Sequence, residues 1–75
     1  MQTSFKRHQP VKLLREPNKE YIEYYSDTEV PIKKGMKGKI NILLPNGEYH
    51  VEIVDDKGEA IAYVLMHEED LEAID

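Results

Sequence analysis

The sequence predicts an all-β fold, a small five-stranded antiparallel barrel with a long tyrosine-rich first connection and a short helical turn before the last strand. Two observations predict this fold class. From Lys33 to Ile74, short apolar runs alternate with glycine-containing turn signals, as in neighbouring strands joined by tight turns. In the run Glu48–Ile53, apolar and polar residues also alternate, which is the period of a strand with one buried face.

The length of 75 residues and the absence of cysteine limit what this domain can be. A chain this short forms one domain with a thin core, which leaves little room for a deep catalytic cleft. Without cysteine it has neither disulfides nor thiolate metal sites. We predict a flexible N-terminal tail over residues 1–9, a single barrel domain over residues 10–75 and no enzymatic activity. No motif implies a cofactor or a bound metal ion.

The first strand is predicted at Val11–Arg15, between Pro10 and Pro17. The connection that follows, Asn18–Lys34, is long for so small a domain, and long connections are often functional or mobile. It holds several aromatic side chains, which must pack on the barrel, on each other or on a partner. These side chains are Tyr21, Tyr24 and Tyr25.

Two glycine-marked reversals organise the middle of the chain. Gly35 and Gly38 predict a tight turn in which both glycines adopt a positive φ. A strand over Lys39–Leu44 follows, and Asn46-Gly47 then reverses the chain as a strong hairpin signal.

The strand after this hairpin has two distinct faces, and a second hairpin signal, Asp55–Gly58, ends it. We assign its apolar face to the core and its polar face to solvent. The apolar face consists of Tyr49, Val51 and Ile53, and the polar face consists of Glu48, His50 and Glu52.

The fourth strand, Glu59–Met66, carries apolar residues on both faces. One face fills the barrel, and the other is covered by the long connection or by a partner. We favour the connection because it brings so much apolar material with it. His67–Asp70 suits a short helical turn whose adjacent side chains point apart, so it does not predict a metal site. Ala73 and Ile74 are expected to form a last strand that returns to the first.

Several segments together resemble a family of small prokaryotic SH3-like barrel proteins of unknown function. In that family a Gly-x-x-Gly turn, a Tyr-x-Val-Glu strand, an Asp-x-x-Gly hairpin and a terminal Asp-Leu corner occur in this order. The matching residues are Lys34–Ile40, Asn46–Asp55, Gly58–Ala62 and Glu69–Leu71. The resemblance implies an SH3-like barrel and supplies no catalytic residues. The pattern is also loosely similar to barrel modules of ribosome-associated and transcription-elongation proteins that bind RNA or protein.

The leading functional hypothesis is a non-catalytic module that binds another protein through the tyrosine-rich connection and the barrel face. Tyrosine combines a large contact area with a polar tip and is frequent in recognition surfaces. The residues predicted for this surface are Tyr21, Tyr24, Tyr25 and Tyr63. In the alternative interpretation these rings only cap a thin barrel, and their exposure distinguishes the two.

A second functional hypothesis is an RNA-binding module that uses the basic glycine turn and the N-terminal strand. Its predicted contact residues are Lys33, Lys34, Lys37, Lys39 and Arg15. Residues 1–47 carry nine Lys or Arg against five Asp or Glu, whereas residues 48–75 carry one against ten. The net charge of −5 and the isoelectric point near 5.1 disfavour nucleic acid as the partner.

The sequence contains no apolar segment of the length that a secretory signal or a membrane span requires. We therefore expect a soluble cytoplasmic protein without a membrane partner. No motif identifies the partner protein, and exposed strand edges leave self-association into a homo-oligomer open.

Overall fold

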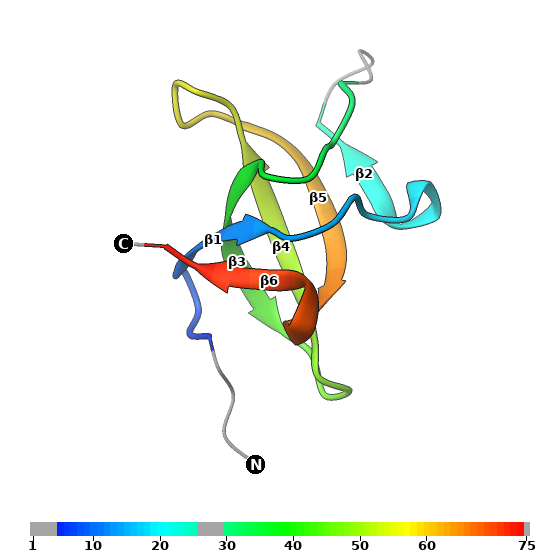
Figure 1. Ribbon diagram of the computed structural model, residues 1–75, viewed down its shortest axis with the longest axis vertical. Coiled ribbons are helices and arrows are strands. Elements are labelled where there is room, and N and C mark those ends of the chain that lie inside the picture. The colour runs from blue at the N-terminus through cyan, green and yellow to red at the C-terminus, as the bar shows by residue number, and fades with distance from the viewer. Residues whose placement is uncertain (1–4, 26–29, 75) are drawn as a thin grey trace.

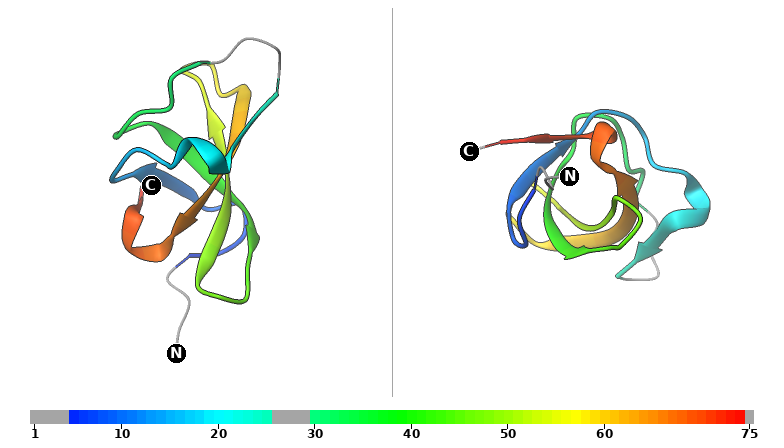
Figure 2. Two further views of the ribbon diagram at one scale, coloured as in Figure 1. Left: turned by 90° about the vertical axis from the view of Figure 1, so that its right-hand side faces the viewer. Right: turned by 90° about the horizontal axis from the view of Figure 1, so that it is seen from below.

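One antiparallel sheet of six strands organises the fold, in the order β2-β5-β4-β3-β1-β6 (Figure 1). The computed structural model describes residues 5–25 and 30–74. The strands curl around a common core, as the view from below shows (Figure 2). The elements in chain order are β1 (Pro10–Leu13), the 3₁₀ turn η1 (Lys19–Tyr21), β2 (Ile22–Tyr24), β3 (Lys37–Leu43), β4 (Glu48–Val54), β5 (Ala60–His67), the 3₁₀ turn η2 (Glu68–Asp70) and β6 (Leu71–Ala73).

The all-β prediction is confirmed, but the sheet has six strands and is open, with β2 and β6 at its two edges. The additional strand is β2, which lies within the segment predicted as a connection. It pairs with β5 through the registers Ile22 to Val64 and Tyr24 to Ala62. Ile22 and Tyr24 also pack against the core, so apolar burial holds this short strand in place.

The two central hairpins form where the turn signals predicted them. Gly47 closes the turn between β3 and β4 with a φ of 77°, and Gly58 closes the turn between β4 and β5 with a φ of 82°. In the second turn the Asp55 carboxylate accepts hydrogen bonds of 2.9 Å from the backbone N–H groups of Lys57 and Glu59. An aspartate that bonds the backbone two residues on is typical of such turns.

The core is built from the inward-facing residues of these strands. The predicted core residues of β4 are confirmed, because Tyr49 is 2% exposed while Val51 and Ile53 are fully buried. Alternation along β4 turns their neighbours to the outer side of the sheet. The buried hydrophobic residues are Phe5, Val11, Leu13, Ile32, Ile40, Tyr49, Val51, Ile53, Ala62, Val64, Met66 and Leu71.

Gly38 differs from the prediction that it forms a positive-φ turn. Gly35 has the expected φ of 92°, but Gly38 is a buried residue within β3, and its φ is not positive. A Cβ atom built on Gly38 would lie 2.5 Å from the backbone oxygen of Glu52 and 3.0 Å from Cγ1 of Val51. Glycine is therefore required here by the close approach of β3 to β4 and not by backbone conformation.

The N-terminal segment contributes to the core. Phe5 is buried, and its ring meets that of Tyr49 edge to face, with centroids 5.3 Å apart and planes at 74°. Backbone hydrogen bonds of 2.7 and 3.0 Å then join the chain before β1 to Ile40 in β3. The described part of the predicted tail is thus packed on the sheet, and residues 1–4 lie outside the described residues.

The end of the chain follows the prediction closely. A short helical turn, η2, precedes the last strand, and β6 pairs with β1. In this pairing the buried Leu71 lies opposite the buried Leu13. The last strand spans Leu71–Ala73 and not the predicted Ala73 and Ile74, so it begins two residues earlier and ends one residue earlier; Leu71 joins it because its pairing with Leu13 buries both side chains.

Candidate functional site

Four side chains meet on the outer side of β4, β5 and the end of β2, and we call this surface the tyrosine face: Tyr25, His50, Glu52 and Tyr63. Glu52 of β4 lies directly opposite Tyr63 of β5 in the sheet register. Tyr25 follows β2, and its backbone N–H donates to the carbonyl of Ile61 in β5 over 3.1 Å. The pairing of β2 with β5 therefore brings Tyr25 to Tyr63.

The rings of the tyrosine face are held in fixed relation to one another. The Tyr25 and Tyr63 rings lie 5.1 Å apart with planes tilted by 57°, and the His50 ring stacks on Tyr63 at 4.7 Å and 20°. Nδ2 of Asn41 in β3 lies 2.9 Å from Nδ1 of His50, which is within hydrogen-bond distance. Such stacked and tilted pairs are the favoured geometries of aromatic rings.

Glu52 joins the two phenol groups. Its Oε2 lies 3.4 Å from the hydroxyl of Tyr25 and 3.3 Å from that of Tyr63, and the two hydroxyls are also within hydrogen-bond distance of each other. Because each hydroxyl has one proton to donate, one phenol can donate to the other while the second donates to the carboxylate. This shared network restrains both rings.

The four tyrosines that were predicted to form one surface lie in different parts of the structure. Tyr25 is 54% exposed and Tyr63 is half-buried beside it. Tyr24 is half-buried against the core. Tyr21 is 51% exposed but lines a different hollow of about 200 Å³, together with Arg15. The predicted surface therefore reduces to Tyr25 and Tyr63, and His50 and Glu52 join it from the polar face of β4.

The hydrogen bond with Tyr25, together with partial burial and the charge of Glu52, raises the pKa of Tyr63 from 10.0 to about 12. A raised phenol pKa means that the fold favours the neutral hydroxyl. The resulting stabilisation is complete below pH 10 and is lost as the pH rises towards about 12. We expect the Tyr63 hydroxyl of the folded protein to ionise near pH 12, measured as the difference in phenolate absorbance between the wild type and Tyr63→Phe after a rapid pH jump, and Tyr25→Phe to move this step back towards 10. Ionisation of Tyr63 near pH 10 in the folded protein would contradict the hydrogen-bonded pair.

The five predicted basic contact residues are also divided. Lys37 and Lys39 both project from the outer side of β3, and Lys37 lies directly opposite Lys12 of β1. Arg15 lies elsewhere, with Nη1 3.8 Å from the carboxylate of Asp70. The other two, Lys33 and Lys34, are exposed in the turn before Gly35.

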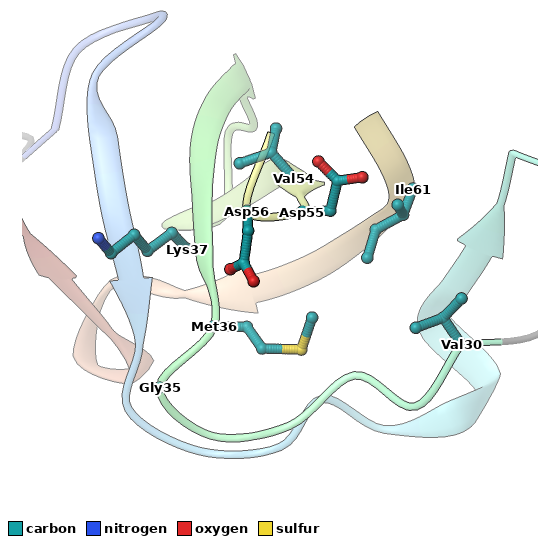
Figure 3. A pocket seen from close by; sticks show the side chains of 8 residues that line it. All are labelled: Val30, Gly35, Met36, Lys37, Val54, Asp55, Asp56 and Ile61. Atoms are coloured by element: carbon teal, nitrogen blue, oxygen red, sulfur yellow. The ribbon is translucent and has the colours of Figure 1, made fainter. Parts of the chain in front are cut away.

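A hollow of about 560 Å³ lies where the β4–β5 hairpin approaches the turn at Gly35 (Figure 3). Its apolar lining consists of Val30, Met36, Val54 and Ile61. Figure 3 shows the Asp56 carboxylate directed into this hollow and the Lys37 side chain directed away from it. Asp55 serves the adjacent turn through its backbone hydrogen bonds. Of the predicted contact residues only Lys37 contributes to the lining of this hollow, and its ammonium group points away, so the hollow is not the predicted surface.

The acidic corner around η2 uses its side chains in separate contacts. Nε2 of His67 lies 3.7 Å from the carboxylate of Glu48. Glu68 accepts a hydrogen bond of 3.1 Å from the hydroxyl of Tyr49, and Asp70 faces Arg15. Within the ranges 5–25 and 30–74, no three His, Cys, Asp or Glu side chains are grouped so that they could hold a metal ion.

Among the residues that the structure describes, no helix has the length and apolar character needed to cross a membrane. Comparisons of the chain with protein-family models, with curated proteins and with solved structures find no match. The candidate site therefore depends on the geometry of this chain alone.

Proposed function

We propose that this chain is a non-catalytic module that binds a segment of another protein on the tyrosine face. The observation that carries this proposal is the pair of linked rings on the outer side of the sheet, of which Tyr25 is 54% exposed although Glu52 restrains its hydroxyl. Rings that only cap a core would be covered. An exposed ring in a fixed position offers contact area with little loss of entropy on binding.

An exposed apolar side chain near the β3–β4 turn extends the contact area available to a partner. Ile42 is 46% exposed at the end of β3 and lies opposite His50 in the register, on the same side of the sheet. Binding surfaces commonly combine an aromatic centre with such apolar and polar surroundings.

We also propose that the sheet is an SH3-like barrel of the family that the sequence resembles. The strand arrangement supports this proposal, because β3, β4 and β5 follow one another as neighbours and β6 returns to β1 after a 3₁₀ turn. In this interpretation β2 is an addition within the long first connection. An experimental structure in which β6 leaves β1 would contradict it.

The binding proposal is tested by selecting peptides from a displayed library on the folded protein and measuring their affinity for variants. Tyr25→Ala should raise the Kd of a selected peptide by about tenfold or more, as expected for the loss of a central aromatic contact. Tyr21→Ala is the matched control, because Tyr21 has nearly the same exposure, 51%, on a different surface. Equal losses in both variants, or amide shift changes that avoid β4 and β5 in an NMR titration, would refute the tyrosine face as the binding site.

RNA binding is the second candidate, and the outer side of β1 and β3 favours it. Lys12, which is also paired with Glu72 at 3.1 Å, lies directly opposite Lys37 in the register, and Lys39 lies two residues further along β3. With about three phosphate contacts, affinity for single-stranded RNA should fall by roughly twentyfold between about 50 and 200 mM salt. An absence of binding at low salt would eliminate this candidate.

A further inference from the structure

Glu52 carries a negative charge for which the described part of the chain supplies no ion-pair partner. The ion pairs among the described residues join Lys12 to Glu72, Arg15 to Asp70 and His67 to Glu48. Glu52 is in none of them, although Lys39 lies opposite it in the β3–β4 register. Glu52 is half-buried as a residue, and its carboxylate lies within hydrogen-bond distance of two neutral hydroxyls. Hydroxyl donors stabilise a carboxylate without neutralising it.

On the side of β5 and β2, away from Lys39, the surroundings of Glu52 add to the negative potential. The faces of the two phenol rings carry the negative side of the aromatic quadrupole. Glu23 of β2 lies opposite Tyr63 in the register, on the far side from Glu52. A row of carboxylate, phenol and carboxylate therefore crosses β4, β5 and β2 on the outer side of the sheet.

We propose that the tyrosine face recognises an arginine side chain of the bound segment, with the guanidinium on the exposed Tyr25 ring and hydrogen-bonded to Glu52. This inference depends on the proposed function and specifies the chemistry of its partner. Arginine fits better than lysine because its planar guanidinium both stacks on an aromatic ring and donates to a carboxylate in a fixed fork. The same charge arrangement disfavours a phosphate group at this site.

The test compares two short peptides in NMR titrations of the full chain at low salt. One is acetyl-Gly-Arg-Gly-amide, and the other carries citrulline in place of arginine, which keeps the shape but removes the charge. We expect the arginine peptide to shift the signals of Tyr25, Glu52 and Tyr63 and to bind at least about fivefold more tightly than the citrulline peptide. Raising the salt should reduce this difference, because exposed charges are screened.

Variants locate the effect on Glu52. Glu52→Gln keeps a hydrogen-bond acceptor for both hydroxyls and should abolish the preference for arginine. Glu69→Gln makes the same charge change at an exposed position in η2 and should retain the preference. Tyr25→Phe, which keeps the ring and removes only the hydroxyl, serves as a second probe if Glu52→Gln proves unstable, and it should retain most of the preference.

The outcomes separate this inference from the proposed function. Equal affinity of the arginine and citrulline peptides, with shifts at the tyrosine face, would overturn the arginine preference and leave the face as a protein-binding surface. An arginine preference that survives Glu52→Gln, or shifts that lie away from the face, would also overturn it. Failure of the library selection described above would refute the proposed function itself.

Discussion

Replacing Gly38 by alanine is expected to lower the free energy of unfolding by about 3 kcal/mol. The added methyl group would lie 2.5 Å from the carbonyl oxygen of Glu52, an atom that is fixed by the strand pairing of β4. A flexible side chain could move aside, but this backbone oxygen can move only if β3 and β4 separate. Urea denaturation followed by circular dichroism measures the loss.

Gly58→Ala is the matched control for this substitution. Gly58 has a φ of 82° and open space around the position of a Cβ atom, so alanine there meets conformational strain without a clash. We expect a loss of about 1 kcal/mol, the cost of placing an ordinary residue in the left-handed region. If Gly38→Ala lowered the free energy of unfolding no more than Gly58→Ala does, this would contradict the close approach of β3 and β4 at Gly38.

Phe5→Ala is expected to lower the free energy of unfolding by about 2–3 kcal/mol, the second-largest effect. Phe5 is 5% exposed and packs edge to face on Tyr49, so truncation removes a buried ring from a thin core. The loss lies at or just below the lower end of the range for phenylalanine because the N-terminal segment can detach and so avoid leaving a cavity. Chemical denaturation of the variant measures it.

Two further variants distinguish a core role of Phe5 from a tail. Phe5→Leu keeps most of the apolar volume and should lose only about 1 kcal/mol. Ile42→Ala shortens an apolar side chain that is 46% exposed, and it should change stability by less than about 0.5 kcal/mol. A stability change for Phe5→Ala as small as that for Ile42→Ala would support a flexible tail.

The central part of the fold is predictable from the sequence because its signals are local. Asn46-Gly47 and Asp55–Gly58 specify turns within a few residues, and alternation along β4 specifies which side chains are buried. Phe5 and β2 could not be predicted in this way. A single phenylalanine in a polar segment has no periodicity, and Ile22–Tyr24 is too short to show one, so only their partners in β4 and β5 define their structure.

The candidate site was predictable in part for the same reason. The outward direction of His50 and Glu52 follows from alternation, and the importance of Tyr25 and Tyr63 follows from their chemistry. The contact of Tyr25 with Glu52 depends on the β2–β5 pairing, which no local pattern specifies. Gly38 shows the converse case, in which a local pattern gives the wrong structure. Its spacing from Gly35 predicts a turn at both glycines, but Gly38 instead lies within β3, where a side chain would clash with β4.

The strand order has a consequence for how the molecule assembles. The hairpins of β3, β4 and β5 close short loops, whereas β2 joins β5 and β6 joins β1 across much of the sequence, which costs more entropy and slows folding. We therefore expect β3, β4 and β5 to form first and the outer strands to dock onto them later. Because Tyr25 reaches Glu52 only after β2 has docked, we expect the tyrosine face to form at the end of folding and to be among the first parts to open when the protein fluctuates.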